Sequence, residues 1–346
     1  MGARVAEFEE AFAELLGSRH AFAVANGTAA LHLALLAGGC GPGDEVVVPS
    51  LNFVAAANTI VHTGAMPVFC DVKGMHDLNL DSDDVEAAIT PATKAIVVLH
   101  YGGFACDMGA VLELAERHGL VVIEDAAHAP GSRYDGRMCG TLGAIGCFSF
   151  FSNKNLPVGE GGMVVTDDDD IAERLRLLRS HGMTTLTWDR HRGHASTYDV
   201  LLQGFNYRLD EVRASMGLVQ LRRLEQENAA RQKIVRQYGE ALHGVSGLTM
   251  PFRERLGDGD SAHHLAVALV SDPATRDRVR LDLADRGVQT SLHYPPIHLF
   301  TAYRDGGGRR LPQTEEAASR LITLPLFAHM REEQVSTVID AVIAAT

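Results

Sequence analysis

The pattern of hydrophobic and polar positions alternates between short apolar runs and longer amphipathic stretches. The apolar runs predict buried strands at Glu45–Pro49, Pro67–Val72, Ala95–His100, Leu120–Glu124, Cys147–Phe151 and Gly162–Thr166. The stretches between them predict helices at Thr28–Ala37, Ala55–His62, Met108–His118 and Ile171–His181. Strands that are apolar throughout and alternate with helices indicate an α/β fold, with a mostly parallel sheet covered on both faces.

The pattern changes in the last third of the chain. A long helical stretch with few breakers runs from Leu209 to about Leu242, and Pro251–Ser261 is then rich in Gly, Asp and Arg. We therefore predict a large domain over residues 1–235 and a smaller C-terminal α+β domain over residues 236–346.

Composition and charge narrow the class of protein. The 346 residues carry 31 Lys and Arg against 44 Asp and Glu, a formal charge of −13, which disfavours nucleic acid and anionic membranes as partners. Four glutamates lie in the first helix-like stretch, so it is no signal peptide, and no apolar run is long enough to span a membrane. Five widely spaced cysteines without a C-x-x-C pair fit a reducing compartment. These features predict a soluble, cytoplasmic protein.

Common catalytic and nucleotide-binding motifs are absent from the sequence. It has no G-x-x-x-x-G-K-[ST] loop, no G-x-G-x-x-G between a strand and a helix, no H-E-x-x-H and no G-x-S-x-G. His181, His191 and His194 have no carboxylate or thiol partners at ligand spacing, and we interpret them as polar loop residues. No metal site is expected.

Ligands of doubly wound sheets collect at the carboxyl ends of the strands, so the residues after each predicted strand are the first candidates for a site. The segment Gly27–Leu31 opens an apolar helix, whose free N–H groups and positive dipole end suit a phosphate. Gly27 lets the backbone approach closely, and Thr28 can cap the helix and donate its hydroxyl. Taken alone, this segment is better explained as a plain capped helix.

Two further segments carry candidate chemistry. Asp125 follows an apolar strand and can face a cationic ring nitrogen, although an aspartate here can also cap a helix. Ser149 ends a strand, and Lys154 follows five residues later beside aromatic residues that would lower the pKa of its amine and favour Schiff-base chemistry. A solvated loop lysine is the alternative. Together the segments suggest a phosphate cradle, an acid for a pyridine nitrogen and a Schiff-base lysine, which pyridoxal phosphate requires.

With these residues identified, the sequence resembles the DegT/StrS family of sugar aminotransferases, which are fold type I enzymes dependent on pyridoxal 5'-phosphate. The likeness runs through nearly the whole chain, in segments that include Gly27–Leu31, Glu124-Asp125, Phe148–Lys154, Gly159–Gly162, Asn206–Leu209 and His293–His298.

The resemblance implies roles for individual residues. Lys154 would hold the cofactor as a Schiff base and move protons, Asp125 would keep the pyridine nitrogen protonated, and His128 would lie near the phenolic oxygen. Phe53 is expected to stack on the cofactor ring, unless it is a core residue. The phosphate would be bound by Gly27, Thr28, Ala29 and Ser149, and by Asn206 from the second subunit of a homodimer. The sugar pocket would be lined by His293, Tyr294 and His298.

The function implied by the resemblance is transfer of an amino group from L-glutamate or L-glutamine to a keto-sugar, usually a nucleotide-linked one. A keto-cyclitol acceptor, another reaction of the same cofactor such as dehydration, and a non-catalytic binding protein remain alternatives. Lys154 favours transamination, because the family's dehydratases carry histidine at this position. The segment Thr184–Tyr198, with Trp188, is longer than in many relatives and is expected to shape substrate choice or to form an exposed loop.

Overall fold

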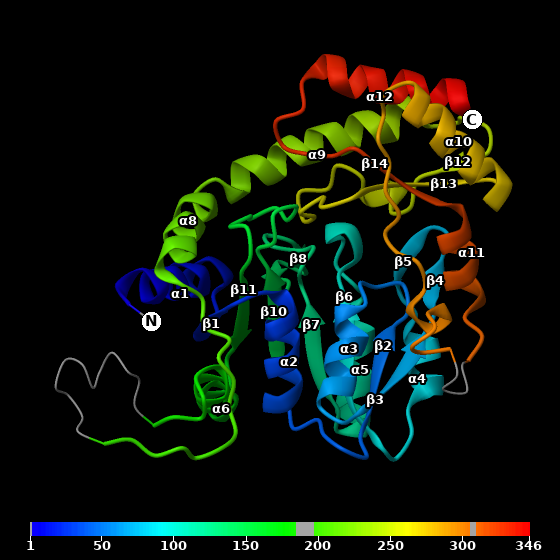
Figure 1. The fold of residues 1–346 in the computed structure, drawn as a ribbon. Coiled ribbons are helices and arrows are strands. Elements are labelled where there is room, and N and C mark those ends of the chain that lie inside the picture. The colour runs from blue at the N-terminus through cyan, green and yellow to red at the C-terminus, as the bar shows by residue number, and fades with distance from the viewer. Residues whose placement is uncertain (1, 185–196, 305–308) are drawn as a thin grey trace.

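The computed structural model describes residues 2–184, 197–304 and 309–346 (Figure 1). Trp188, His191 and His194, which the sequence analysis singles out, lie outside the described residues.

A seven-stranded sheet forms the centre of the larger part of the molecule (Figure 1). Its strands are β1 (His20–Val24), β2 (Glu45–Pro49), β3 (Met66–Cys70), β6 (Thr93–Leu99), β7 (Val121–Asp125), β10 (Ile145–Ser149) and β11 (Gly162–Thr166). They lie in the order β1-β11-β10-β7-β6-β2-β3, and within this sheet β11 alone runs against its neighbours. The predicted α/β fold with a mostly parallel sheet is confirmed.

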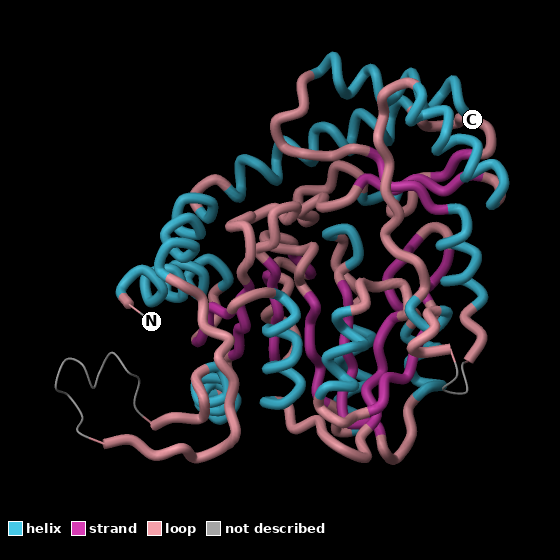
Figure 2. The backbone as a smooth tube through the Cα atoms, in the orientation of Figure 1, coloured by secondary structure: helices cyan, strands magenta, loops and turns pink. Residues whose placement is uncertain are grey.

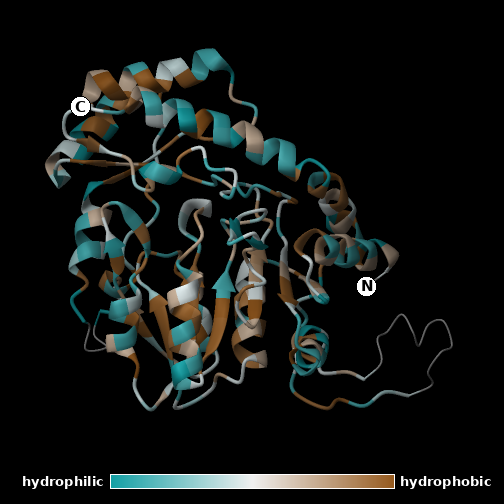
Figure 3. Cartoon of the chain, turned by 180° about the vertical axis from the view of Figure 1, so that it is seen from behind, coloured by the Kyte–Doolittle hydropathy of each residue, from teal (hydrophilic) through white to brown (hydrophobic). Residues whose placement is uncertain are grey.

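Helices cover both faces of this sheet because its strands are apolar on both sides. Along β6, Ile96 and Val98 pack on the face covered by α1 (Ala3–Leu16), α4 (Ser82–Ala88) and α5 (Met108–His118). Ala95 and Val97 pack on the opposite face, against α2 (Gly27–Ala37), α3 (Ala55–His62) and α6 (Asp169–Arg179). In Figure 3 the central strands are accordingly coloured as hydrophobic.

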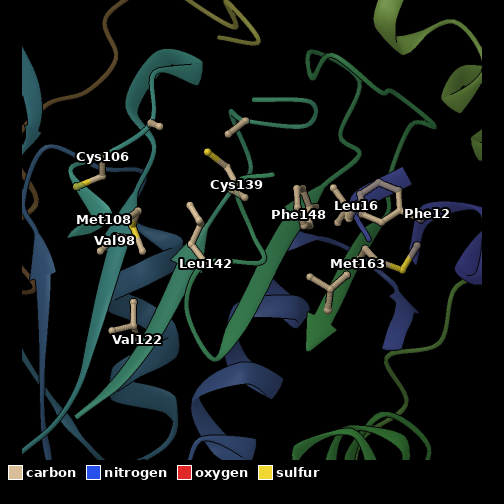
Figure 4. Packing of buried hydrophobic residues seen from close by; sticks show 14 of the residues in the cluster. Phe12, Leu16, Val98, Cys106, Met108, Val122, Cys139, Leu142, Phe148 and Met163 are labelled. Atoms are coloured by element: carbon tan, nitrogen blue, oxygen red, sulfur yellow. The ribbon is translucent and has the colours of Figure 1, made fainter. Parts of the chain in front are cut away.

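The core under α1 is aromatic (Figure 4). The rings of Phe12 and Phe148 meet edge to face with centroids 5.0 Å apart, and Phe8 lies 5.3 Å from Phe150. Such pairs add about 0.5–1.5 kcal/mol each beyond the area that they bury. They fix β10, and with it the segment that leads to Lys154.

Two predicted elements differ from the structure. The strand predicted at Pro67–Val72 ends at Cys70, because the Asp71 carboxylate turns away to accept hydrogen bonds from the backbone N–H groups of Gln313 and Thr314. The long helix predicted from Leu209 to about Leu242 is two helices, α8 (Glu211–Leu221) and α9 (Leu224–Ala241). It breaks where the chain leaves α1, on which α8 packs, and turns toward the C-terminal part (Figure 1).

The C-terminal part has its own core above the carboxyl ends of the main sheet (Figure 2). It contains the antiparallel sheet β12-β13-β14 (Leu248–Thr249, Ala266–Val270 and Leu321–Leu324), α10 (Pro273–Asp285), α11 (Pro312–Arg320) and α12 (Glu332–Ala345). Residues of α9 from Ile234 onward pack into this core, so the boundary predicted after residue 235 falls within α9.

Short elements complete the described chain. They are the hairpins β4-β5 (Val72–Gly74, Asp77–Leu80) and β8-β9 (Arg133–Tyr134, Arg137–Met138), and the 3₁₀ turns η1 (Tyr101–Gly103), η2 (Arg253–Arg255) and η3 (Ile297–Leu299). Within the described residues no helix combines the length and apolar character that a membrane span requires.

Candidate active site

A cavity of about 370 Å³ lies at the carboxyl ends of the parallel strands, where the doubly wound topology predicts a ligand. Nine of the predicted site residues line it: Gly27, Thr28, Phe53, Asp125, His128, Ser149, Lys154, His293 and Tyr294. They come from the start of α2, from the segments after β2, β7 and β10, and from the loop that follows α10.

One end of the cavity is an anion cradle. Helix α2 begins at Gly27, and the first N–H groups of a helix have no acceptor within it. A Cβ atom on residue 27 would lie 2.8 Å from the Cβ of Ser149, so glycine is required for the helix to start this close to β10. The hydroxyls of Thr28 and Ser149 line the same end, which therefore suits a phosphate.

The cap of α2 differs from the prediction. Asn26, not Thr28, is the N-cap residue: its Oδ1 accepts a hydrogen bond of 2.8 Å from the N–H of Ala29. The Thr28 hydroxyl is therefore without a hydrogen-bond partner among the described residues. The N–H of Ala29, in contrast, already donates to Asn26.

Asp125 is the last residue of β7 and is only 5% exposed. Burial raises the pKa of its carboxyl. The Ala127 N–H, whose nitrogen lies 3.2 Å from Oδ1, and the Lys154 amine both act to lower this pKa. Beside it in the cavity wall is Asn52, whose Nδ2 is buried without a geometrically satisfactory partner among the described residues. The Asn52 side chain also acts to lower the pKa of Asp125, so a buried acid and an amide beside it border the cavity.

The Lys154 side chain reaches the same centre. Burial lowers the pKa of its amine to about 8, although the nearby Asp125 carboxylate acts in the opposite direction. At a given pH a larger fraction of this amine is therefore neutral, and hence nucleophilic, than of a solvated lysine.

The residue after the lysine anchors the loop. Asn155 is buried; its Nδ2 donates to Asn228 Oδ1 (2.8 Å) and to the Ala262 carbonyl (2.7 Å). Its Oδ1 faces His264 Nδ1 at 2.9 Å. The loop that carries Lys154 is thereby attached both to α9 and to the segment that enters the C-terminal sheet.

His128 and Tyr294 form a pair on the far side of the cavity. His128 Nε2 lies 2.8 Å from the Tyr294 hydroxyl, and the two rings are nearly parallel. The Gly102 N–H points at His128 Nδ1 from 3.4 Å, which favours the tautomer with the proton on Nε2. Burial lowers the pKa of His128 well below its usual value, and the Lys154 charge adds to this. His128 is therefore a neutral donor to Tyr294.

Two other residues complete the wall. The Phe53 ring is 56% exposed and lies 6.1 Å from the ring of Tyr294, so the structure does not bury it in the core. His293 Nδ1 lies 3.0 Å from Thr323 Oγ1, and burial lowers the pKa of the imidazole to about 4.

Three predicted residues are not among those lining the cavity. The Ala29 N–H is used by Asn26, and Asn206 is exposed and pairs with Ser180 through its backbone. His298 is buried against Ser50, with its Nδ1 2.7 Å from the hydroxyl, and its Nε2 lies 3.5 Å from Glu315. Its side chain thus joins segments of the fold away from the cavity.

The structure adds residues that the sequence analysis did not assign to the site. Asn26 could have been found as a cap, since asparagine before a Gly-Thr helix start is a recognised signal. Asn52 carries no such signal, because its role depends on where the chain after β2 meets β7. Glu160 lines the mouth with an exposed side chain. Over the ranges that the structure describes, no three His, Cys, Asp or Glu side chains are placed to hold a metal ion.

Comparison with known proteins supports a specific chemistry for this arrangement. The family model described as the DegT/DnrJ/EryC1/StrS aminotransferase family matches residues 1–343. The spore coat polysaccharide biosynthesis protein SpsC of Bacillus subtilis (strain 168) is 42% identical over 99% of this chain and 89% of its own length. The GDP-perosamine synthase of Caulobacter vibrioides is 41% identical over 99% of this chain and 90% of its own length.

Solved structures agree with this assignment. The aminotransferase TlmJ from Streptoalloteichus hindustanus superposes with a TM-score of 0.92 at 41% identity, covering 99% of this chain and 91% of that one. The PLP form of a sugar aminotransferase, Spr1654 from Streptococcus pneumoniae, superposes with a TM-score of 0.92 at 27% identity, covering 100% of this chain and 91% of that one. The chain belongs to the DegT/DnrJ/EryC1/StrS family of sugar aminotransferases.

Proposed function

We propose that this enzyme uses pyridoxal 5'-phosphate to move an amino group from L-glutamate or L-glutamine to the ketone of a nucleotide-linked sugar. The observation that carries the proposal is the arrangement of three groups around one cavity: the anion cradle at α2, the buried Asp125 carboxylate and the Lys154 amine, whose pKa is lowered to about 8.

The residues present fit this cofactor. The cradle of Gly27, Thr28 and Ser149 offers N–H and O–H donors to a phosphate, and the Asn52 amide lies beside the Asp125 carboxyl in the cavity wall. The exposed ring of Phe53 offers an apolar surface at the cavity for a planar group. When bound, the cofactor supplies an electron-accepting ring that stabilises negative charge on the carbon that loses a proton.

The chain's own residues then supply binding and proton transfer. Asp125 would keep a proton on the ring nitrogen, since a buried carboxylate interacts strongly with a cation in contact with it. Lys154 would provide the neutral amine that anchors the cofactor, and the same amine would carry a proton to or from the reacting carbon. The neutral His128 donates to the Tyr294 hydroxyl and so orients that hydroxyl in the cavity wall.

The choice of acceptor rests on the relatives. The name of the Caulobacter relative specifies a GDP-linked amino sugar, and that of the Bacillus relative specifies polysaccharide biosynthesis. A keto-cyclitol is the alternative acceptor for the same chemistry. We place the reaction in the cytoplasm, in keeping with five cysteines that are all unpaired and buried.

We further propose a homodimer in which Asn206 binds the phosphate in the cavity of the other subunit. Asn206 is exposed and outside its own cavity, and α8, which follows it, has an exposed apolar stripe of Val212, Met216 and Val219. The spacing i, i+4, i+7 places these three side chains on one face of the helix, which suits contact with a second copy.

A mixing experiment tests the shared site. Lys154→Ala and Asn206→Ala, each inactive or weakened alone, should regain activity when the two variants are mixed and their subunits exchange. The recovered site would combine Lys154 from one chain with Asn206 from the other. No recovery, with subunit exchange verified by tagged chains, would assign Asn206 to its own subunit or to no site.

The visible absorption spectrum tests the proposed function. The purified protein should show the band of a lysine-linked cofactor, and L-glutamate or L-glutamine should bleach it with release of the matching 2-oxo acid. A nucleotide-linked keto-sugar should then restore the band. A band that no amino acid bleaches would replace transamination by another reaction of the cofactor, and no band after adding pyridoxal phosphate would remove the cofactor.

A further inference from the structure

A buried serine and a buried histidine join the end of β2 to the chain between α10 and α11. Ser50 directly follows β2 and is fully buried, and His298 in η3 is 5% exposed. The Ser50 hydroxyl oxygen lies 2.7 Å from His298 Nδ1 and accepts the His298 N–H at 3.2 Å. The Ser50 carbonyl also accepts the Ile297 N–H at 3.0 Å. Three contacts thus attach η3 to the end of β2.

The proton positions in this pair follow from its partners. Because the Ser50 oxygen already accepts a backbone N–H, and His298 Nδ1 is the one acceptor within its reach among the described residues, the hydroxyl donates to Nδ1. The imidazole proton is then on Nε2, 3.5 Å from Glu315 Oε1. Burial lowers the pKa of His298, against the raising effect of Glu315, so the imidazole is neutral at neutral pH.

A serine, a histidine and a glutamate in series also form the catalytic group of some hydrolases. Here the serine cannot meet a substrate, because Ser50 is fully buried and is not among the residues that line the active-site cavity. His298 Nε2 has no geometrically satisfactory partner among the described residues, so the link to Glu315 is weak. The role of the pair therefore lies in what it connects.

The pair connects two short segments that both reach the cavity. Residues 50–53 lead from Ser50 to Phe53, and residues 294–298 lead from His298 back to Tyr294. Phe53 and Tyr294 line the cavity, with ring centroids 6.1 Å apart. The two segments are therefore joined by a buried hydrogen bond at one end and face each other through aromatic rings at the other.

Both segments are stiff enough to transmit a change in position. Pro295 and Pro296 fix φ at two positions of one segment. In the other, Asn52 Oδ1 accepts the Phe53 N–H at 2.6 Å, and the Asn52 amide lies beside the Asp125 carboxyl in the cavity wall. A shift at the buried pair would therefore change the part of the wall against which the cofactor ring is proposed to lie.

We propose that His298 is a positioning residue for the cofactor: its hydrogen bond to Ser50 fixes the segment of Phe53 in the arrangement that binds the ring. This inference rests on the binding of pyridoxal phosphate in the proposed function. It gives a role in the site to a histidine that does not line the cavity.

The dissociation constant of pyridoxal phosphate, measured by titrating the cofactor-depleted full-length protein, tests the proposal. Ser50→Ala removes the donor and His298→Leu removes the acceptor, so each should raise this constant about tenfold, because a buried partner is left unpaired. Since both variants lose the same bond, the two changes combined should weaken binding no more than either alone.

A conservative variant separates the hydrogen bond from the bulk of the ring. His298→Asn should bind pyridoxal phosphate as the wild-type protein does, because the amide Oδ1 can take the place of Nδ1 as the acceptor. The visible circular dichroism of the bound cofactor, which reports the orientation of its ring, should change in Ser50→Ala and His298→Leu but not in His298→Asn.

Thr166→Val is the matched control for the loss of a buried hydroxyl. Thr166 is buried at the opposite edge of the sheet, where its hydroxyl donates to the Ala144 carbonyl at 2.8 Å. This variant should lose stability in denaturant, as Ser50→Ala does, but keep the wild-type dissociation constant. An equal loss of affinity in the control would show that affinity follows stability alone and would overturn the positioning role.

Three further results would each overturn the inference: an unchanged dissociation constant in Ser50→Ala, additive effects in the combined variant, or equal weakening by His298→Asn and His298→Leu. Bleaching of the visible band by L-glutamate reports separately on transamination. The expected pattern of affinities without bleaching would disprove the proposed reaction alone. Bleaching with unchanged affinity in Ser50→Ala would disprove the positioning role alone.

Discussion

Two neighbouring acids at the end of β7 have opposite environments. Glu124 is fully buried and accepts hydrogen bonds from the N–H groups of Gly140, Leu142 and Gly143 at 2.6–2.7 Å, and it lies 2.8 Å from His100 Nε2. Asp125 is almost as buried, but the Ala127 N–H is the one backbone donor within hydrogen-bond distance of it among the described residues.

The difference distinguishes a structural acid from a functional one. A strand directs consecutive side chains to opposite faces, so Glu124 points to the loop after β9 and Asp125 to the cavity. A buried carboxylate whose acceptor sites are all used holds the fold together. One with unused capacity, facing a cavity, is available to a ligand.

The largest effect is expected at the amine that Asp125 faces. Lys154→Ala should reduce transamination to background and remove the visible band, because no other lysine of the described residues lines the cavity. Circular dichroism should show an unchanged fold. Full activity in this variant would show that the lysine has no catalytic role.

Asp125→Asn comes next. It keeps the shape but removes the negative charge, and it should lower the rate of the donor half-reaction by about a hundredfold or more. Stability should change little, since few hydrogen bonds are lost. An unchanged rate, measured by stopped-flow absorbance with L-glutamate, would mean that another group holds the ring proton.

Glu124→Gln should give the reverse result. The new amide nitrogen would face either Gly140 and His100 or Leu142 and Gly143, which are all donors, at a cost of about 2–4 kcal/mol in the free energy of unfolding. Denaturant unfolding measures this loss. The rate of the donor half-reaction, measured on the folded fraction, should fall less than it does in Asp125→Asn. A larger fall in this rate than in Asp125→Asn would contradict the assignment of Glu124 as the structural acid and Asp125 as the functional one.

The smallest effect is a shift in pH dependence. In cofactor-depleted protein, capture of added pyridoxal phosphate requires neutral Lys154, so its rate should rise with pH and level off above about 8. Since the Asp125 charge raises the pKa of Lys154, Asp125→Asn should move the midpoint lower. A midpoint near that of a solvated lysine would contradict the burial of the amine.

The same contrast shows what the sequence could predict. Gly27, Asp125, Ser149 and Lys154 were identified because the carboxyl ends of parallel strands meet at one edge, and a strand end is visible in the apolar pattern. The fold class followed from the same pattern.

Residues brought together by distant segments could not be placed in this way. The pairings of His128 with Tyr294 and of Ser50 with His298 depend on how the C-terminal domain meets the sheet. The break between α8 and α9 carries neither glycine nor proline at Arg222-Arg223, and it arises from packing on α1.

The attachment of Asn155 has a consequence for motion. Because this side chain joins the loop of Lys154 to α9 and to the entrance of the C-terminal sheet, a rotation of that domain must either move the lysine loop or break hydrogen bonds of the buried Asn155. Any such rotation would therefore be energetically coupled to the position of the Lys154 amine.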